Sequence, residues 1–311
     1  MNPQTEIQYN FSQEAIITKR LLRAGSRESK LALIQTNIVI EQLKRHYPDW
    51  EFEIVRIKTQ GDKFLNAALG EVGGKGLFVK EIEEALFSGA IDMAVHSMKD
   101  VPSELPEGLH ISAVTKREDP RDVFISMNGM RFSELATGAR IGTSSLRRAV
   151  QLKAIRPDVE ILPIRGNVST RIKKMRELDL AGIVLAAAGI KRLGMEEVIT
   201  EYFTPEMMVP AVGQGSLAVE TRIDDELSEL IRCINDTNTE SAVKAERAFM
   251  QALGGSCKIP IGAYAEVEGN TLTLIGMVEK DGIINKGSIS QKVSLAEEAG
   301  IKLARELGEL Q

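Results

Sequence analysis

Short runs of apolar residues alternate along this chain with longer stretches in which apolar residues recur every three or four positions. The short runs predict strands and the longer stretches predict helices. The predicted strands span 21–24, 50–57, 91–95, 139–141, 160–164 and 182–187, and the predicted helices span 31–38, 77–87, 146–155 and 168–178. This alternation is typical of an α/β fold with mostly parallel sheets, in which functional loops lie at the carboxyl ends of the strands.

Two polar or proline-bearing segments, 115–122 and 204–210, interrupt the alternation and indicate that the chain enters a second domain and then returns. From about residue 237 the pattern changes to one helix, a Gly-Gly-Ser-Cys loop and two strands of alternating polarity. The sequence therefore predicts two α/β domains that form a two-lobed fold, followed by a small α+β domain. The predicted divisions are a disordered extension at 1–18, domain 1 at 19–115 and 215–236, domain 2 at 120–210, and domain 3 at 237–311.

Composition narrows the function classes. The chain has 311 residues, is 43% hydrophobic, and carries 44 acidic against 39 basic residues, for a net charge of −5. This balance gives no general footprint for nucleic acid. The sequence contains no apolar stretch of the roughly 18 residues that a membrane span needs, and the polar segment 1–18 does not resemble a secretory signal. With only two cysteines, a disulfide framework is not expected, and the predicted location is the cytoplasm.

Three turns bear arginine at predicted strand-to-helix junctions: 25–29, 142–148 and 165–171. A helix N-terminus presents unpaired N–H groups and the positive end of the helix dipole, so it attracts anions. Arginine adds a planar group that fits a carboxylate with two hydrogen bonds. Any one turn could be an ordinary helix cap beside a solvated arginine, but three in a net-negative chain favour a site for several carboxylates or phosphates.

Other motifs carry less weight. Residues 213–218 match a dinucleotide fingerprint, but the alternation of Leu217, Val219 and Thr221 predicts a strand where that motif needs a helix. The glycines between Gly70 and Gly76 suggest a flexible lid over a site rather than a phosphate loop. The three histidines show no metal-ligand spacing, so no metal is expected.

Lys99 and Asp100 directly follow a predicted strand, which is the usual place for catalytic groups in α/β folds. A partly desolvated aspartate there could stabilise a developing cation or move a proton, although an ordinary loop ion pair is the simpler interpretation. Cys257 lies in a loop beside Lys258, a setting that favours the reactive thiolate. Cys233 falls within helical apolar spacing and is expected to be a packed residue.

These segments together resemble one family, the porphobilinogen deaminases, also called hydroxymethylbilane synthases. The resemblance covers about 21–261 in order and rests on HSMKDVP (96–102), REDPRD (117–122), GTSSLRR (142–148), RGNVSTR (165–171), LAAAGIKRLG (185–194), PAVGQG (210–215) and the Cys257 loop. Where the family often has Glu-Gly-Gly-Cys, this chain has Gly-Gly-Ser-Cys, which leaves the cysteine in place and concerns only the local backbone.

The resemblance implies a transferase that joins four porphobilinogen molecules head to tail, releases ammonia and hydrolyses off hydroxymethylbilane. It implies a dipyrromethane cofactor bound by a thioether to Cys257, two lobes like those of periplasmic binding proteins, and a monomer without nucleic-acid or membrane partners. Asp100 is the expected catalytic carboxylate. The residues expected to hold cofactor carboxylates are Ser97, Lys99, Thr143, Ser145, Arg147 and Arg148. Those expected to hold substrate or the growing chain are Arg27, Ser29, Arg165, Arg171 and Arg192.

Two other function classes remain at this stage. A non-catalytic two-lobed protein that binds an anion would explain the arginine turns equally well, but it would not require Cys257 or the Lys99-Asp100 pair. A nucleotide-dependent oxidoreductase rests only on the fingerprint at 213–218.

Overall fold

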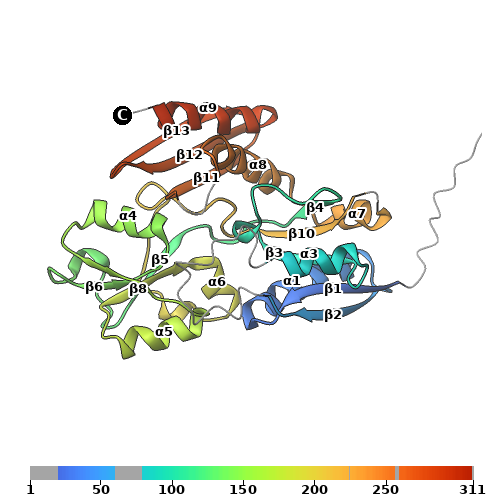
Figure 1. The fold of residues 1–311 in the computed structure, drawn as a ribbon, viewed down its shortest axis with the longest axis horizontal. Helices are drawn as coiled ribbons and strands as arrows, with labels where there is room; N and C mark the ends of the chain where they lie inside the picture. Colours follow the sequence, from blue (N-terminus) through green and yellow to red (C-terminus); the bar gives the residue numbers. More distant parts are fainter. Residues whose placement is uncertain (1–19, 60–78, 224, 256–258, 310–311) are drawn as a thin grey trace, which may run out of the picture.

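The computed structural model describes residues 20–59, 79–223, 225–255 and 259–309. The described chain forms three sheets, two of five strands and one of three. Figure 1 shows them as two lobes side by side, with the third sheet and its helices above both. The α/β class and the small C-terminal α+β domain predicted from the sequence are confirmed. The domain boundaries proposed above stay a prediction.

The first lobe is built on a sheet of order β2-β1-β3-β10-β4. Its strands are β1 (Leu21–Arg27), β2 (Glu51–Ile57), β3 (Met93–Ser97), β4 (Leu109–Val114) and β10 (Leu217–Arg222). Its helices are α1 (Lys30–His46), α3 (Lys80–Phe87) and α7 (Glu226–Ile231). Strand β10 runs antiparallel to both of its neighbours, so the other four strands share one direction.

The second lobe repeats this plan in a sheet of order β7-β6-β8-β5-β9. Its strands are β5 (Asp122–Ser126), β6 (Arg140–Gly142), β7 (Glu160–Leu162), β8 (Gly182–Ala186) and β9 (Glu201–Tyr202), and its helices are α4 (Leu146–Ile155), α5 (Val168–Glu177) and α6 (Ala187–Arg192). Here β5 is the antiparallel strand. In each lobe the reversed strand is the one that the chain enters from a crossing segment, so the two predicted crossings explain why the sheets are not wholly parallel.

The third sheet is antiparallel and consists of β11 (Ile261–Glu268), β12 (Thr271–Lys280) and β13 (Ile283–Lys292). Helices α8 (Thr237–Ala252) and α9 (Ala296–Glu309) pack with it around one apolar core. Short 3-10 turns lie at η2 (Met98–Asp100), η3 (Phe132–Glu134), η4 (Glu196–Val198), η5 (Arg232–Ile234) and η6 (Val293–Leu295).

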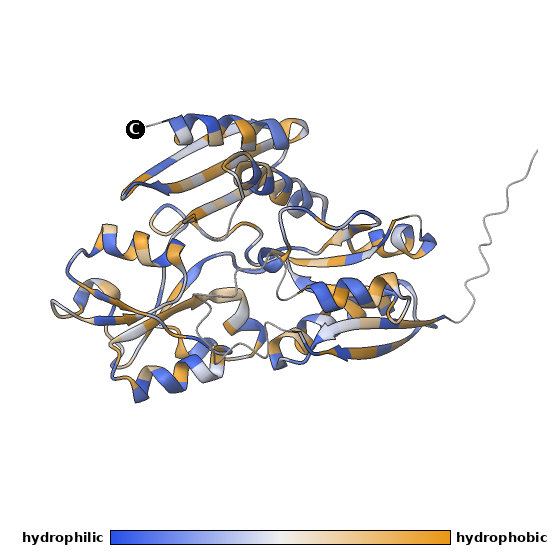
Figure 2. Ribbon diagram, viewed as in Figure 1, coloured by the Kyte–Doolittle hydropathy of each residue, from blue (hydrophilic) through white to orange (hydrophobic). Residues whose placement is uncertain are grey.

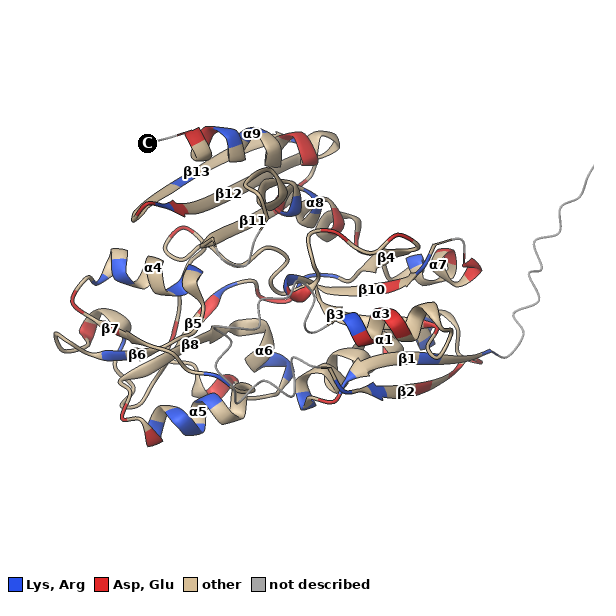
Figure 3. Ribbon diagram, in the orientation of Figure 1, with Lys and Arg blue, Asp and Glu red and all other residues tan. Residues whose placement is uncertain are grey.

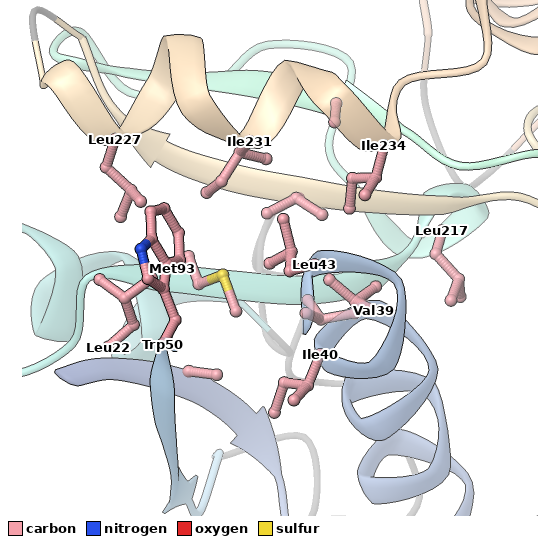
Figure 4. Close-up of a cluster of buried hydrophobic side chains, with 14 residues drawn as sticks. Leu22, Val39, Ile40, Leu43, Trp50, Met93, Leu217, Leu227, Ile231 and Ile234 are labelled. Atoms are coloured by element: carbon pink, nitrogen blue, oxygen red, sulfur yellow. The ribbon is translucent and has the colours of Figure 1, made fainter. Parts of the chain in front are cut away.

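Each lobe has its own apolar interior. In the first lobe, side chains of α1, α7 and the sheet strands converge, and Trp50 and Met93 lie among them (Figure 4). In Figure 2, apolar residues concentrate on the inner strands, and the helices carry polar residues on their outer faces. Cys233 packs against the first-lobe core, as its helical spacing predicted, and burial raises the pKa of its thiol. The two lobes therefore have separate apolar cores, and they also touch where α1 meets α6.

A buried carboxylate ties the crossings to the third domain. Glu246 on α8 accepts hydrogen bonds from Arg117 of the first crossing at 2.7 Å, from the N–H of Gly213, just after the second crossing, at 2.6 Å, and from the Ala265 N–H of β11 at 2.8 Å. Burial raises the pKa of Glu246, while Arg117 and the two amides act in the opposite direction. One side chain thus connects both crossings to the domain that carries Cys257.

Candidate functional site

The ends of β1 and β3 enclose a small pocket in the first lobe. It has a volume of about 70 Å³ and is lined by Arg27, Ser29, Leu31, Ala32, Gln35, Val79, Val95, His96, Ser97 and Asp100. The structure therefore brings together four of the predicted site residues, Arg27, Ser29, Ser97 and Asp100. Gln35 on α1 donates from Nε2 to Ser97 Oγ at 2.8 Å, which fixes the serine at the end of β3.

Local sequence explains this arrangement. Ser29 caps α1, where its Oγ accepts a hydrogen bond from the Ala32 N–H at 3.2 Å. The turn η2 follows β3 directly and carries Lys99 and Asp100, both exposed to solvent. Gly213, just after the second crossing, packs against this turn with a φ of +70°, and a Cβ there would lie 2.6 Å from Met98 Cγ. Glycine is therefore required for the chain to pass against η2 at this point.

Charges from the second lobe act on η2. The pKa of Lys99 is lowered to about 8, chiefly because surrounding protein partly desolvates the ammonium group. Asp100 opposes this effect, Arg148 and Arg147 lower the pKa further, and Asp122 raises it. The pKa of Arg171 is lowered by burial and by Arg148, while Asp100 raises it. We call Lys99, Asp100, Arg147, Arg148 and Arg171 the interlobe cluster, because their charges interact from opposite lobes.

The turn at the start of α4 is more enclosed than the sequence suggests. Ser145 caps α4 by accepting from the Arg148 N–H at 3.4 Å, and Thr143 Oγ1 accepts from the Ser145 N–H at 3.2 Å. Arg147 and Arg148 are only 6% exposed. Arg147 donates to Asp122 Oδ2 at 2.7 Å, and Arg148 donates from Nε and Nη2 to Asp122 Oδ1 at 3.1 and 2.8 Å.

These arginines therefore share a carboxylate of the protein itself. Asp122 is fully buried, it also accepts from Gln214 Nε2 at 3.0 Å, and the two arginines hold its pKa far below the usual range despite burial. One carboxylate against two guanidinium groups leaves a net positive charge at the start of α4. The role of Arg147 and Arg148 in holding cofactor carboxylates stays a prediction. In that role, the remaining positive charge would attract the carboxylates.

Replacement of Asp122 by asparagine is expected to lower the stability of the second lobe by about 3–5 kcal/mol, because two buried guanidinium groups would lose their counter-charge. Glu177→Gln is the matched control, since Glu177 pairs with Lys173 on the exposed face of α5 at 3.4 Å and should matter by no more than about 0.5 kcal/mol. Urea denaturation measures both. Equal small shifts for the two variants would contradict a structural role for the Asp122 cluster.

The remaining predicted arginines come from three parts of the second lobe. Arg165 follows β7, Arg171 lies on α5, and Arg192 ends α6. Figure 3 shows basic residues in blue on α5 and α6. Arg171 donates from Nε to the Gly166 carbonyl at 2.7 Å. Arg192 donates from Nη2 to the Gly215 carbonyl at 2.6 Å, and burial lowers its pKa to about 10 against the opposing effect of Glu118. Arg192 thus links the second lobe to the segment that leads into β10, and its role toward substrate stays a prediction.

Three predicted features lie outside the described residues: the extension at 1–18, the proposed lid at 70–76 and Cys257. Sequence reasoning also missed several buried polar groups, of which Asp122 and Glu246 are described above. A third group is the pair His96 and Glu220, with Nε2 and Oε2 2.9 Å apart. Asp122 is the last residue of the REDPRD segment, one of the motifs that carry the family resemblance. Only the fold shows that it faces two arginines.

No group of three or more His, Cys, Asp or Glu side chains that could hold a metal ion occurs in the described part of the chain. Among the helices of the described residues, none combines the length and the hydropathy needed to cross a membrane.

Comparisons with known proteins cover almost the whole chain. Residues 22–229 match the family model described as porphobilinogen deaminase, dipyrromethane cofactor binding domain, and residues 241–309 match porphobilinogen deaminase, C-terminal domain. A porphobilinogen deaminase of Carboxydothermus hydrogenoformans is 53% identical over 292 residues, which is 93% of this chain and 94% of that protein. One of Geobacter sulfurreducens is 53% identical over 289 residues, or 92% and 91%.

Solved structures show a weaker likeness. The periplasmic aliphatic sulphonate binding protein SsuA of Escherichia coli is 10% identical, with a TM-score of 0.40 over 76% of this chain and 71% of that one.

Proposed function

The chain belongs to the porphobilinogen deaminase family, and from this premise we propose how its own residues carry out the reaction. The enzyme is a hydroxymethylbilane synthase, a transferase of tetrapyrrole biosynthesis that joins porphobilinogen units head to tail with loss of ammonia. The observation that carries the residue assignment is the interlobe cluster: Asp100 on η2 of the first lobe interacts with Lys99 beside it and with Arg171 of the second lobe.

The site suits the dipyrromethane cofactor of the family. Each pyrrole unit bears an acetate and a propionate, so bound rings present several carboxylates to the protein. The described site offers cationic and hydroxyl donors that match this load: Lys99, Arg147 and Arg148 carry positive charge, and Ser97, Thr143 and Ser145 stand at strand ends or helix starts. When bound, the cofactor supplies the primer on which the pyrrole chain grows. We assign its covalent attachment to Cys257.

Asp100 has the central role in this proposal. Loss of ammonia from porphobilinogen leaves an azafulvene cation whose positive charge extends to the pyrrole nitrogen. A carboxylate placed there accepts a hydrogen bond from the pyrrole N–H and stabilises the cation more strongly than it stabilises the uncharged ring. The exposed position of Asp100 on η2, at the edge of the pocket that Arg27 and Ser29 line, suits this task.

The substrate's two carboxylates require hydrogen-bond donors that can bind successive rings as the chain lengthens. We assign this binding to Arg27 and Ser29 in the pocket of the first lobe and to Arg165, Arg171 and Arg192 of the second. Guanidinium groups suit this role because they bind carboxylates with two parallel hydrogen bonds. We further propose that the enzyme works as a monomer in the cytoplasm, without nucleic-acid or membrane partners.

The test of this function is turnover. Purified protein given porphobilinogen should release four molecules of ammonia for each hydroxymethylbilane formed. A non-catalytic binding protein, the alternative considered from sequence, would bind porphobilinogen and release none. Absence of ammonia from protein that binds porphobilinogen would overturn the proposal.

Lys99 gives the assembly of the cofactor a dependence on pH. Its pKa of about 8 in the protein without ligand means that the ammonium charge is lost as the pH rises through that value. The rate at which cofactor-free protein acquires its cofactor is therefore expected to fall above about pH 8, where Lys99 no longer attracts carboxylates. Lys99→Arg, which keeps its charge, should move this fall to higher pH. The same alkaline fall in both proteins would show that another group is responsible.

A further inference from the structure

One face of helix α8 contacts the segment that directly follows Asp100. Arg247 donates from Nη2 to the carbonyls of Pro102 at 2.7 Å and Ser103 at 3.0 Å, and from Nη1 to the carbonyl of Val101 at 3.5 Å. One turn later on the same helix, Gln251 donates from Nε2 to the Ser103 carbonyl at 2.7 Å. We call Arg247 and Gln251 the α8 clamp.

The contact continues beyond the end of the helix. Residues four apart lie on the same face of a helix, so Arg247 and Gln251 extend along one line. Gly255 comes four residues later, and a Cβ built on it would meet Ser103 Cβ and Oγ at 3.5 Å. Gly255 is the last described residue before the segment that holds Cys257. Arg247, Gln251 and Gly255 therefore all lie against the same stretch, 101–103. This contact extends from α8 to the start of the cysteine loop.

The clamped segment depends on outside donors for its shape. Residues 101–103 belong to no strand, and Pro102 has no N–H to give. Within the segment, the Val101 N–H closes η2 by donating to the Met98 carbonyl at 3.1 Å. The carbonyls of 101–103 point instead to α8, where a guanidinium group can satisfy several at once. Asp100 is thus the last residue of a turn closed by its own backbone, and it directly precedes a stretch held by another domain.

Arg247 differs from the arginines that are paired with a buried carboxylate. Arg147 and Arg148 are paired with Asp122, and Arg117 is paired with Glu246. Burial alone lowers the pKa of Arg247, with no contribution from an acidic group in the described part of the chain. A cation placed among carbonyls without a counter-charge costs desolvation energy. A need for several hydrogen-bond donors at this one place therefore explains Arg247 better than a contribution to stability does.

We propose that Arg247 and Gln251 are positioning residues for the reaction, which fix the spacing between Asp100 and the loop that begins at Gly255. The inference rests on the proposed roles of Asp100 and Cys257. The growing chain is anchored in domain 3, whereas the charge that stabilises the cation lies in the first lobe. The α8 clamp joins these two points directly. It therefore keeps Asp100 at a fixed distance from the anchor while each new ring is added.

Holoenzyme of Arg247→Gln and Gln251→Ala tests this role through kcat and KM for porphobilinogen. We expect kcat to fall about tenfold for Arg247→Gln while KM changes less than about twofold, because a small misplacement of a reacting group lowers the rate without loss of binding. The cofactor mass should be retained. Arg247→Lys should recover only part of kcat, since a single ammonium group cannot reach three carbonyls.

Two controls separate positioning from stability. Lys244→Gln alters an exposed residue of the same helix that pairs with Glu240 at 3.3 Å, and it should leave kcat unchanged. Leu307→Ala removes a buried side chain of the domain 3 core on α9, and it should lower stability with kcat preserved. An unchanged kcat in Arg247→Gln, an equal fall in Leu307→Ala, or loss of the cofactor from Arg247→Gln would each overturn the proposal.

Amide hydrogen exchange distinguishes this proposal from the proposed function. Residues 98–104 should exchange faster in Arg247→Gln than in the unaltered protein, whether or not the protein turns over porphobilinogen. Unchanged exchange there would overturn the clamp alone, whereas unaltered protein that releases no ammonia would overturn the proposed function.

Discussion

Asp100→Asn is expected to lower turnover at least a hundredfold while the protein folds normally. The amide keeps the shape of the side chain and can still accept a hydrogen bond from a pyrrole N–H, but it lacks the negative charge that stabilises the azafulvene cation. Loss of one such electrostatic group costs on the order of 3 kcal/mol of transition-state stabilisation. Because Asp100 is exposed on η2 rather than part of a core, the stability of the fold should change little.

Single-turnover release of ammonia measures this effect most directly, because it reports the step in which the cation forms. Glu104→Gln is the matched control: it removes a carboxylate that is also exposed and lies four residues along the chain. We expect that variant to release ammonia at the normal rate. Ammonia release by Asp100→Asn at a near-normal rate would rule out Asp100 as the group that stabilises the cation.

Cys257→Ser is expected to abolish covalent attachment of the cofactor, and Cys233→Ser is expected to preserve it. Thioether formation needs an accessible, nucleophilic sulfur. Cys233 packs beside the first-lobe core, and burial raises the pKa of its thiol, so its thiolate is disfavoured at neutral pH. Serine at 257 retains the size of the side chain but cannot form the thioether bond.

The intact mass of each variant, purified under identical conditions, decides between the two cysteines. The account predicts an added mass on Cys233→Ser and none on Cys257→Ser. An adduct retained by Cys257→Ser protein would place the attachment elsewhere.

The alternating apolar runs were sufficient to predict the α/β lobes, and the two polar segments marked where the chain changes lobe. The alternation of Leu217, Val219 and Thr221 predicted a strand at β10 but not its reversed direction, and strand β5 was not predicted. The direction of these strands depends on the crossings and leaves no trace in local periodicity. Strand β4 was also missed, since its neighbouring segments carry the stronger signals. The observed ends of the elements differ from the predicted ends by a few residues. Apolar runs mark burial, whereas the end of a strand depends on its hydrogen-bonded partners.

The site residues show the same division between local and distant information. The turns at 25–29 and 142–148 lie at helix starts, and Lys99 with Asp100 follows a strand, as neighbouring residues in the sequence indicated. The pairing of Arg147 and Arg148 with Asp122 joins residues 25 and 26 positions apart, and no local pattern predicts it. Loss of either arginine would therefore disturb the fold of the second lobe as well as any contact with cofactor.

The central claim is that the chain grows porphobilinogen units on a primer attached through Cys257, and the intact mass of the unaltered protein tests it most directly. The account predicts a mass that exceeds the sequence mass by two pyrrole units, and further species, each one unit heavier, after brief exposure to porphobilinogen. A protein at the sequence mass alone, unchanged by porphobilinogen, would contradict the account.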